Sequence, residues 1–337
     1  MTTVHDVAKE AGVSAITVSR VINNSGYISQ ATKEKVEKAV EKLGYVPNTL
    51  ARGLRSKRTH TLALIVTDIT NPYFTLMARG VEDSAGASDY TVIYCNTDES
   101  ETKEEKYANM LAQRQVDGVL LVPAGGNANT VRFLQTNGIA VVVLDRRVVG
   151  VKTDFVFSDS QTGANRLIKL LIDLGHKHIA VITGPKKVST SIDRVSGYRE
   201  ALREAGLLEL ENISYGTFNQ QSGYTLAKQV MLRSPRPTAI MGANNFITIG
   251  IIKAIEELGL RVPEDVSVVG FDDLPESMLI KPFLTVAAQP AYEIGRAATD
   301  LLIKRISGEL TGRCKELVLP TEIIERQSSS PKRRSGK

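Results

Sequence analysis

The sequence lacks several features that would place it in common protein classes. Its 337 residues include no Trp, two Cys and 5% aromatic residues. Cys95 and Cys314 are far apart and form no spaced motif, which favours free thiols in a reducing compartment. The sequence has no run of eighteen apolar residues and no apolar N-terminal segment of the signal-peptide type. We therefore expect a protein without a membrane span or signal peptide, located in the cytoplasm.

Motifs for common enzyme chemistry are also missing. The sequence contains neither GxxxxGKS nor GxxxxGKT, no GxGxxG after a predicted strand and no HExxH, so nucleotide and metalloprotease chemistry are not indicated. His176 and His178 lie between a predicted helix and a predicted strand, where solvated or capping histidines are commoner than metal ligands. We expect no catalytic residue, no metal and no cofactor.

Basic residues are concentrated at the two ends of the chain. Residues 1–60 contain ten Lys or Arg and five Asp or Glu, residues 61–327 contain 28 and 32, and the last ten residues add four basic side chains. A basic segment alone is usually a solvated face, so the local structure of the N-terminal segment must decide its role.

Residues 1–46 predict three short helices. Thr3 precedes an apolar stripe and has Asp6 at the capping-box spacing. Gly12 provides a turn, and Ser14 can cap a second helix whose inward residues are Ala15, Val18, Val21 and Ile22. Ser29 can cap a third helix that ends before Gly44. This order predicts an all-α helix-turn-helix domain.

The outward face of the second helix favours contact with nucleic acid. It carries small polar groups, one apolar side chain and one guanidinium, without an acidic residue: Ser14, Ile16, Thr17, Ser19, Arg20 and Asn23. Together with the basic N-terminal charge, this face indicates DNA binding more strongly than a purely structural helical unit.

The segment resembles the N-terminus of the LacI/GalR family of bacterial transcriptional regulators. DVAKEAGVS, TVSRVIN, KVEKAVEKLGYVPN and ARGL match in order and without gaps. The resemblance implies that Ala15, Ile16 and Arg20 face base edges in the major groove, where Arg20 can bind guanine through two hydrogen bonds. It implies phosphate contacts from Thr3, Ser14, Ser19, Asn23, Ser29, Thr32 and Asn48, and Thr17 and Ala51 complete the predicted DNA-binding face. Ala15 and Ile16 replace larger polar residues of the lac repressor, so no operator sequence is carried over.

Residues 47–60 predict a hinge that is helical only when bound. Pro47 and Asn48 suit the start of a helix, but the run is short and Gly53 weakens it by about 1 kcal/mol relative to Ala. The family resemblance implies that two hinges fold together in the minor groove, with Leu54 inserted between base pairs.

The rest of the chain alternates predicted strands and helices in two series. The apolar runs TLALIVTD, YTVIYCNTD, VDGVLLVPA and IAVVVLDR form the first series, and HIAVITGP, TAIMGANN and VSVVGFDD form the second. The resemblance extends to about Gln327 and implies the two-lobed α/β fold of periplasmic binding proteins. The expected N-terminal lobe is 61–159 with 291–318, and the C-terminal lobe is 160–287 with 319–327. Residues 328–337 are Ser-rich and basic, which predicts a disordered tail.

Polar and aromatic residues follow several predicted strands, where doubly wound sheets bind ligands. Singly, such residues commonly cap the next helix. As a set, these residues resemble the pocket of ribose-binding proteins and ribose repressors. The resemblance lies in the segments NPYF, VVVLDRR, GANN, VVGFDD and AAQP. The resemblance implies that Asn71, Asp145, Arg146, Arg194, Asn244, Asp272 and Gln289 bind hydroxyls, and that Tyr73, Phe74 and Phe218 sandwich a sugar ring. Ribose-binding proteins have Phe and Asp at the positions of Tyr73 and Asn245.

These patterns predict a repressor whose affinity for operator DNA is controlled by ribose or another pentose bound between two lobes. The expected assembly is a homodimer on a near-palindromic operator. A dimer is expected rather than a tetramer because nothing in the sequence resembles the C-terminal leucine heptad of the tetrameric lac repressor. The protein is expected to be associated with the nucleoid. One alternative is a corepressor-dependent regulator that binds a purine or a sugar phosphate. The others are a sugar-processing enzyme and a sugar sensor whose N-terminal segment contacts only proteins.

Overall fold

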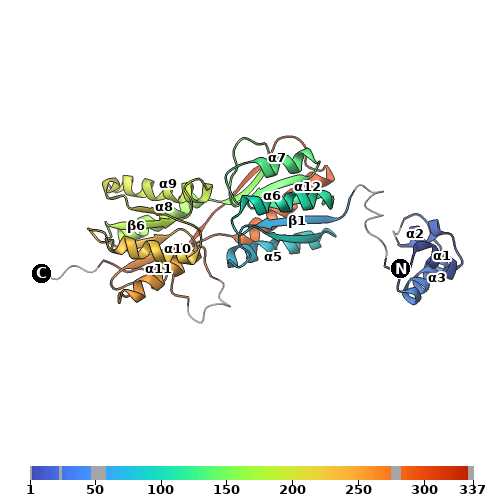
Figure 1. Cartoon of the computed structure of the whole chain (residues 1–337), viewed down its shortest axis with the longest axis horizontal. Coiled ribbons are helices and arrows are strands. Elements are labelled where there is room, and N and C mark those ends of the chain that lie inside the picture. The colour runs from blue at the N-terminus through green and yellow to red at the C-terminus, as the bar shows by residue number, and fades with distance from the viewer. Residues whose placement is uncertain (1, 23–24, 47–57, 275–281, 333–337) are drawn as a thin grey trace. The chain divides into compact units, whose positions relative to one another are not determined.

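The computed structural model describes residues 2–22, 25–46, 58–274 and 282–332. The chain divides into two compact units, Met1–Thr59 and His60–Lys337. The first unit is all-α and the second is α/β (Figure 1). None of the helices in these described ranges combines the length and the apolar character needed to cross a bilayer.

The described part of the first unit contains three helices: α1 (Val4–Ala11), α2 (Ala15–Ile22) and α3 (Gln30–Leu43). The predicted capping box at α1 is confirmed, because Thr3 N donates to the Asp6 carboxylate over 2.8 Å and Asp6 N donates back to the Thr3 hydroxyl. Gly12 and Gly44 adopt the left-handed conformation at the ends of α1 and α3, as expected for helix C-caps. The core is built from Val7, Ala8, Val18, Val21, Val36 and Ala39.

The first lobe of the second unit has a six-stranded parallel sheet in the order β11-β5-β4-β3-β1-β2. Its strands are β1 (Thr61–Val66), β2 (Thr91–Asn96), β3 (Gly118–Leu121), β4 (Ala140–Leu144), β5 (Asp154–Ser158) and β11 (Glu316–Leu319). One face packs against α5 (Pro72–Gly86) and α12 (Ala291–Ser307), and the other against α6 (Glu101–Gln113) and α7 (Asn129–Thr136). Both faces are therefore covered, which explains why the strands are continuous apolar runs.

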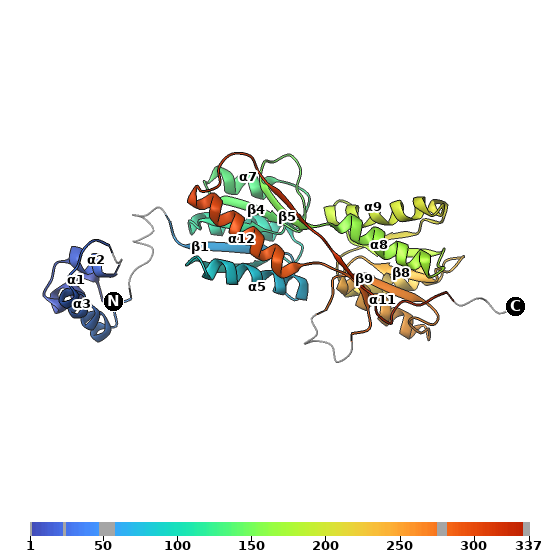
Figure 2. The same cartoon turned by 180° about the vertical axis from the view of Figure 1, so that it is seen from behind.

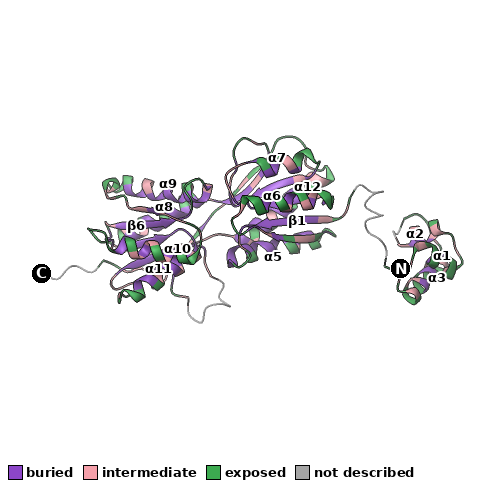
Figure 3. Cartoon of the chain, in the orientation of Figure 1, coloured by how far each residue is buried: buried purple, intermediate pink, exposed green. Residues whose placement is uncertain are grey.

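The second lobe repeats this layout in the order β12-β10-β9-β8-β6-β7. Its strands are β6 (Ile179–Thr183), β7 (Ile213–Tyr215), β8 (Ala239–Gly242), β9 (Ser267–Phe271), β10 (Thr285–Ala288) and β12 (Glu322–Ile324), of which β12 is antiparallel to β10. The helices α8 (Ser160–Asp173) and α9 (Ser189–Glu204) cover one face, and α10 (Gln220–Met231) and α11 (Asn245–Glu257) cover the other. A 3₁₀ helix spans Leu208–Leu210. Figure 3 shows buried strands between helices whose outer faces are exposed.

Within the described ranges the chain passes between the lobes three times: between β5 and α8, between β10 and α12, and between β11 and β12. Figure 2, which views the chain from behind, shows the connection between β11 and β12 crossing from one lobe to the other. Because the strands of each sheet run parallel up to these crossings, the loops at their carboxyl ends meet between the lobes.

The prediction of a disordered tail beginning at residue 328 was wrong for residues 328–332. Ser328 is fully buried, Val268 N donates to its carbonyl oxygen over 2.8 Å, and its hydroxyl donates to the Val268 carbonyl over 2.6 Å. Lys332 N donates to Leu174 O over 2.8 Å. A segment without apolar side chains is thus held by backbone hydrogen bonds beside β9, and residues 333–337 lie outside the described residues.

Candidate functional site

The second helix of the first unit, α2, has the two faces that the sequence predicts. Val18 and Val21 are buried, whereas Ile16 is 68% exposed and Arg20 is exposed. The exposed face therefore presents one apolar side chain and one guanidinium to solvent, as a base-reading surface requires.

Several predicted phosphate-binding hydroxyls serve as helix caps in this unit. The Ser14 hydroxyl accepts a hydrogen bond from Thr17 N over 3.1 Å, and the Ser29 hydroxyl accepts one from Thr32 N over 3.4 Å. These caps fix the hydroxyls at the helix N-termini, where the backbone dipoles favour anions. The predicted contacts Asn23, Asn48, Ala51 and Leu54 lie outside the described residues.

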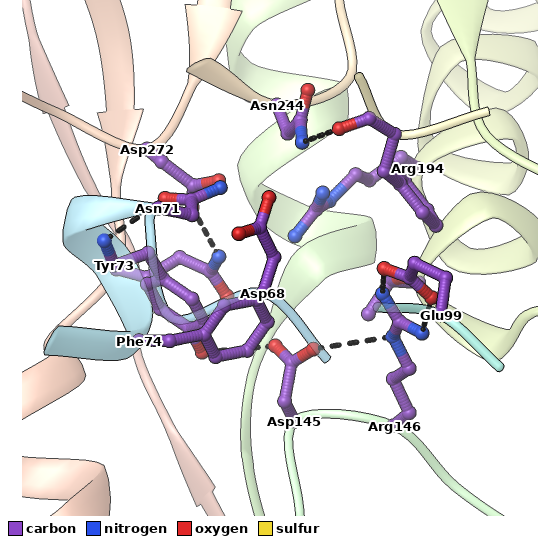
Figure 4. Close-up of a pocket in the computed structure, with 13 residues that line it drawn as sticks. Asp68, Asn71, Tyr73, Phe74, Glu99, Asp145, Arg146, Arg194, Asn244 and Asp272 are labelled. Carbon is purple, nitrogen blue, oxygen red and sulfur yellow. Dashed lines mark hydrogen bonds and ion pairs between the residues drawn. The ribbon is translucent and has the colours of Figure 1, made fainter. Parts of the chain in front are cut away.

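A pocket lies between the two lobes of the second unit, with about 370 Å³ of space not filled by protein atoms. All ten residues predicted to bind the effector line it, together with Asp68, Glu99 and Thr190. Figure 4 shows their polar ends converging from both lobes.

Residues at the start of α5 form the aromatic part of the pocket. Asn71 caps α5 by accepting a hydrogen bond from Tyr73 N, which directs the next two side chains toward the cleft. The Tyr73 and Phe74 rings are buried and meet edge to face at 5.1 Å. The Tyr73 hydroxyl donates to Asp145 Oδ1 over 2.9 Å. Burial, with help from the Asp145 charge, raises the Tyr73 pKa well above its ordinary value, so the phenol is a neutral donor.

Arg146, two residues after the end of β4, is held by partners from both lobes. Its two terminal nitrogens donate to the two Glu99 carboxylate oxygens over 2.5 and 2.7 Å. One of them also donates to Pro123 O over 3.1 Å, and Phe218 of the other lobe lies 5.0 Å from the guanidinium carbon. Burial lowers the Arg146 pKa, but the Glu99 hydrogen bonds and charge raise it by more, so the guanidinium remains charged. Its Nε is buried and has no hydrogen-bond partner within the described part of the chain.

The second lobe contributes a guanidinium, an amide and a carboxylate. Arg194, in α9, donates to Ala243 O and lies 4.2 Å from the Phe271 ring, and its Nε also lacks a partner among the described residues. Asn244 caps α11 and donates to Phe218 O over 3.2 Å. Gln289 donates to Asp272 and accepts from Ser158 of the other lobe. Burial raises the pKa of Asp272.

Three pocket acids have strained backbones. Glu99, Asp145 and Asp272 adopt φ values of 58°, 60° and 66°, in the left-handed region that side chains other than Gly rarely occupy. Each acid directly follows or lies near the end of a strand, and the conformation turns its carboxylate toward the cleft. Strain of this kind persists where the surroundings impose it and gathers at ligand sites.

Two further side-chain contacts link the lobes, in addition to the Ser158–Gln289 hydrogen bond and the contact of Arg146 with Phe218. Asn71 and Asn245 exchange a reciprocal pair of buried amide hydrogen bonds of 3.0 and 2.9 Å. Arg147 pairs with Asp193 of α9 over 2.5 Å, and Arg147 N donates to the Ser189 hydroxyl over 2.8 Å. The pocket is therefore closed on either side by contacts that exist only when the lobes meet.

Glu99 and Thr190 were missed as pocket residues by the sequence prediction, and Asp68, a polar residue after the first predicted strand, was given no ligand contact. Asp68 and Glu99 carried a usable signal, since both are carboxylates that follow parallel strands closely. Thr190 carried none, because a hydroxyl near the start of a helix is indistinguishable from a cap.

His176 of GHKH makes its contacts inside the second lobe. His176 is buried, where its ring nitrogens lie 2.9 Å from the Thr238 hydroxyl and 3.0 Å from Ser330 O, so the expected solvated or capping role was wrong for this residue. The described residues hold no group of three or more His, Cys, Asp or Glu that could bind a metal ion. Cys95 is buried and Cys314 exposed, both as free thiols.

Comparison with known proteins identifies both units. Residues 3–48 match the family of bacterial regulatory proteins of the lacI type, and residues 59–325 match the periplasmic binding proteins and sugar-binding domain of the LacI family. The chain is 36% identical over 335 residues to a ribose operon repressor of Halalkalibacterium halodurans, covering 98% of this chain and 97% of the relative. It is 35% identical over 331 residues to the HTH-type transcriptional repressor PurR of Histophilus somni, covering 97% and 99%.

A solved structure agrees with this relationship. The lac repressor dimer bound to operator and an anti-inducer matches with a TM-score of 0.83 and 27% identity, over 98% of this chain and 99% of that chain. The relatives are repressors rather than enzymes, and their similarity extends over nearly the whole chain. The chain therefore belongs to the LacI family of DNA-binding transcriptional repressors, with a helix-turn-helix domain and a ligand-binding domain.

Proposed function

We propose that the pocket between the lobes binds ribose or a similar pentose, and that this ligand controls the affinity of the repressor for its operator. The observation that carries the proposal is the pair of buried guanidinium groups, Arg146 and Arg194, whose Nε atoms have no hydrogen-bond partner among the described residues; Asp145 lies 3.7 Å from Arg146 Nε, too far for a hydrogen bond. A buried donor without a partner costs about 1–3 kcal/mol, which a ligand hydroxyl oxygen offsets.

The remaining side chains suit the two surfaces of a sugar. Tyr73, Phe74 and Phe218 supply rings for the C–H faces. Carboxylates and amides accept from or donate to paired hydroxyls, and we assign this role to Asn71, Asp145, Asn244, Asp272 and Gln289, with the two arginines. Since these groups come from both lobes, the ligand favours one relative arrangement of the lobes over others.

A purine is the second candidate ligand. The similarity to PurR equals that to the ribose operon repressor within one percentage point, and an aromatic pair can also stack on a planar base. The carboxylates favour the sugar. A sugar has hydroxyls on adjacent carbon atoms, and these can pair with many closely spaced charged groups, whereas a purine has few polar atoms.

For the DNA we propose that α2 enters the major groove in each subunit of a homodimer on a near-palindromic operator. Arg20 reads guanine, while Ala15 and Ile16 contact thymine methyl groups. The solved lac repressor dimer bound to operator supports this arrangement. Leu54 acts in the minor groove, Asn48 contacts a phosphate, Ala51 belongs to the DNA-binding face, and the repressor works at the nucleoid.

The two sites are coupled through the arrangement of the lobes. Ligand binding shifts that arrangement and weakens the contact of the two hinges with the minor groove of the operator. Coupling of about 1–3 kcal/mol changes operator affinity roughly 5- to 150-fold, and linkage requires that operator DNA weaken sugar binding equally.

A thermal-shift screen tests the ligand. Ribose at a hundred times its dissociation constant should stabilise the protein by about 2.7 kcal/mol, and hypoxanthine or guanine should not. Asp145→Asn should abolish the shift because it removes a hydroxyl acceptor. Asp173→Asn, at an exposed position on α8, is the matched control and should keep it. A rise in thermal stability with purines and not with ribose would show that the pocket binds a purine instead of a sugar.

A further inference from the structure

Glu99 decides which atoms of Arg146 remain for a ligand. A free guanidinium presents parallel N–H groups that match the oxygens of a phosphate or carboxylate. In this pocket Glu99 binds both terminal nitrogens of Arg146 over 2.5 and 2.7 Å, and Pro123 O accepts a further bond from one of them. These bonds use three of the five N–H groups of the guanidinium, so Nε–H and one terminal N–H remain for a ligand. The Asp145 carboxylate lies 3.7 Å from Nε, so an anion bound to these N–H groups would lie beside a carboxylate, whereas a hydroxyl can donate to that carboxylate and accept from the guanidinium.

The charge of the lining also opposes an anion. The described lining residues include four carboxylates, Asp68, Glu99, Asp145 and Asp272, and two guanidinium groups. Fully ionised, this set carries a net charge of two negative units, and it remains negative when buried Asp272 is protonated. Since Arg146 is only 4% exposed, its charges and those of its neighbours are weakly screened.

The backbone at Glu99 indicates that its carboxylate is held in place by the fold. Glu99 has a φ of 58°, which is costly for a side chain of its size, and its N–H donates to Thr67 O over 3.2 Å. The backbone next to Pro123 is held as well, because Ala124 N donates to the buried Glu104 carboxylate over 2.6 Å. Arg146 is thus clamped between two preformed acceptors.

We propose that Glu99 makes this pocket selective for neutral polyhydroxylated ligands and excludes phosphorylated or carboxylated ones. Glu99 acts as a positioning residue: it occupies the two terminal nitrogens of Arg146 and, together with Asp145 beside Nε, balances the charge of the guanidinium. This inference rests on the proposed function in one respect, that the pocket takes a small ligand, and it narrows the ligand class by excluding sugar phosphates.

The first test uses inorganic phosphate, which needs no assumption about the sugar. Glu99→Gln exposes the Arg146 fork and removes a negative charge, so millimolar phosphate at constant ionic strength should raise the melting temperature of this variant. The wild type should show no such rise. Glu99→Asp keeps the charge and should behave like the wild type. Glu105→Gln, exposed on α6, is the matched loss of charge outside the pocket and should also behave like the wild type. A phosphate response in the wild type, or none in Glu99→Gln, would overturn the proposal.

The second test compares ribose with ribose 5-phosphate by isothermal titration calorimetry. We expect the wild type to prefer ribose, and Glu99→Gln to reduce the preference by about tenfold or more, since one charge changes close to the ligand. A merely structural role would weaken both ligands equally, and an unchanged ratio would overturn the selectivity. If neither sugar binds the wild type, the pentose assignment fails while the phosphate test still decides the role of Glu99.

Discussion

The ion pair between Arg147 and Asp193 offers a test of how lobe arrangement controls ligand binding. It joins the first lobe to α9 of the second over 2.5 Å, and Arg147 also lies over the Phe157 ring at 5.1 Å. The side chains are 39% and 17% exposed, so the pair is neither a surface pair nor a buried one. Exposed pairs contribute up to about 1 kcal/mol, and breaking a buried pair costs about 3–5 kcal/mol. Allowing for solvent screening, we expect about 1–2 kcal/mol here.

Asp193→Ala should therefore weaken the binding of the sugar about 5- to 30-fold, because the ligand contacts both lobes and binds the arrangement that this pair stabilises. Calorimetric titration of the wild type, Asp193→Ala, Arg147→Ala and the double variant gives the coupling energy between the two residues. The matched control is Glu211→Ala, which breaks a pair of the same 2.5 Å length with Arg199 inside the second lobe. Equal losses for Asp193→Ala and Glu211→Ala, or a coupling energy near zero, would refute the reasoning.

Three further predictions concern pH, packing and DNA. Burial lowers the pKa of His176, although its contact with Ser330 O opposes the shift, so the unfolded chain binds this proton more tightly. The stability that this histidine contributes should be present above its ordinary pKa of 6.5 and decline as the pH falls below it. His176→Gln should therefore make the melting temperature less dependent on pH in that range, and an unchanged pH dependence would contradict this. Gly250→Ala places a Cβ 2.1 Å from Gln220 O, so α10 and α11 must separate, and denaturant unfolding should show a loss of about 1–3 kcal/mol. Arg20→Ala should relax sequence preference in selection from random duplexes, and an unchanged consensus would exclude it as a base reader.

The ten residues proposed from the sequence as effector contacts line one pocket because a parallel sheet brings the ends of its strands together. Strands of a parallel sheet end at one edge, so Asp145, Asn244 and Asp272 had to approach one another once the alternation of strands and helices was recognised. Caps were equally predictable, because Thr3 and Asp6 interact over three residues.

Contacts between distant segments were not predictable in this way. Asn71 and Asn245 are separated by 174 positions, and nothing local distinguishes their amide pair from two helix caps. The ordered tail was missed for another reason: Ser328 has no apolar side chain, and its burial depends on backbone groups of β9 that composition does not reveal. The partner of Arg146 was missed because an acid after a strand has many possible roles, and only the fold brings Glu99 to it.

The central claim is that a sugar bound in the pocket controls the affinity of the repressor for operator DNA. Fluorescence anisotropy measures it most directly, with a labelled duplex selected by the purified protein from a random pool and titrated at fixed salt with and without saturating ribose. We predict that ribose weakens operator binding roughly 5- to 150-fold and that operator DNA weakens ribose binding by the same factor. Equal operator affinity with and without a ribose that demonstrably binds would contradict the account.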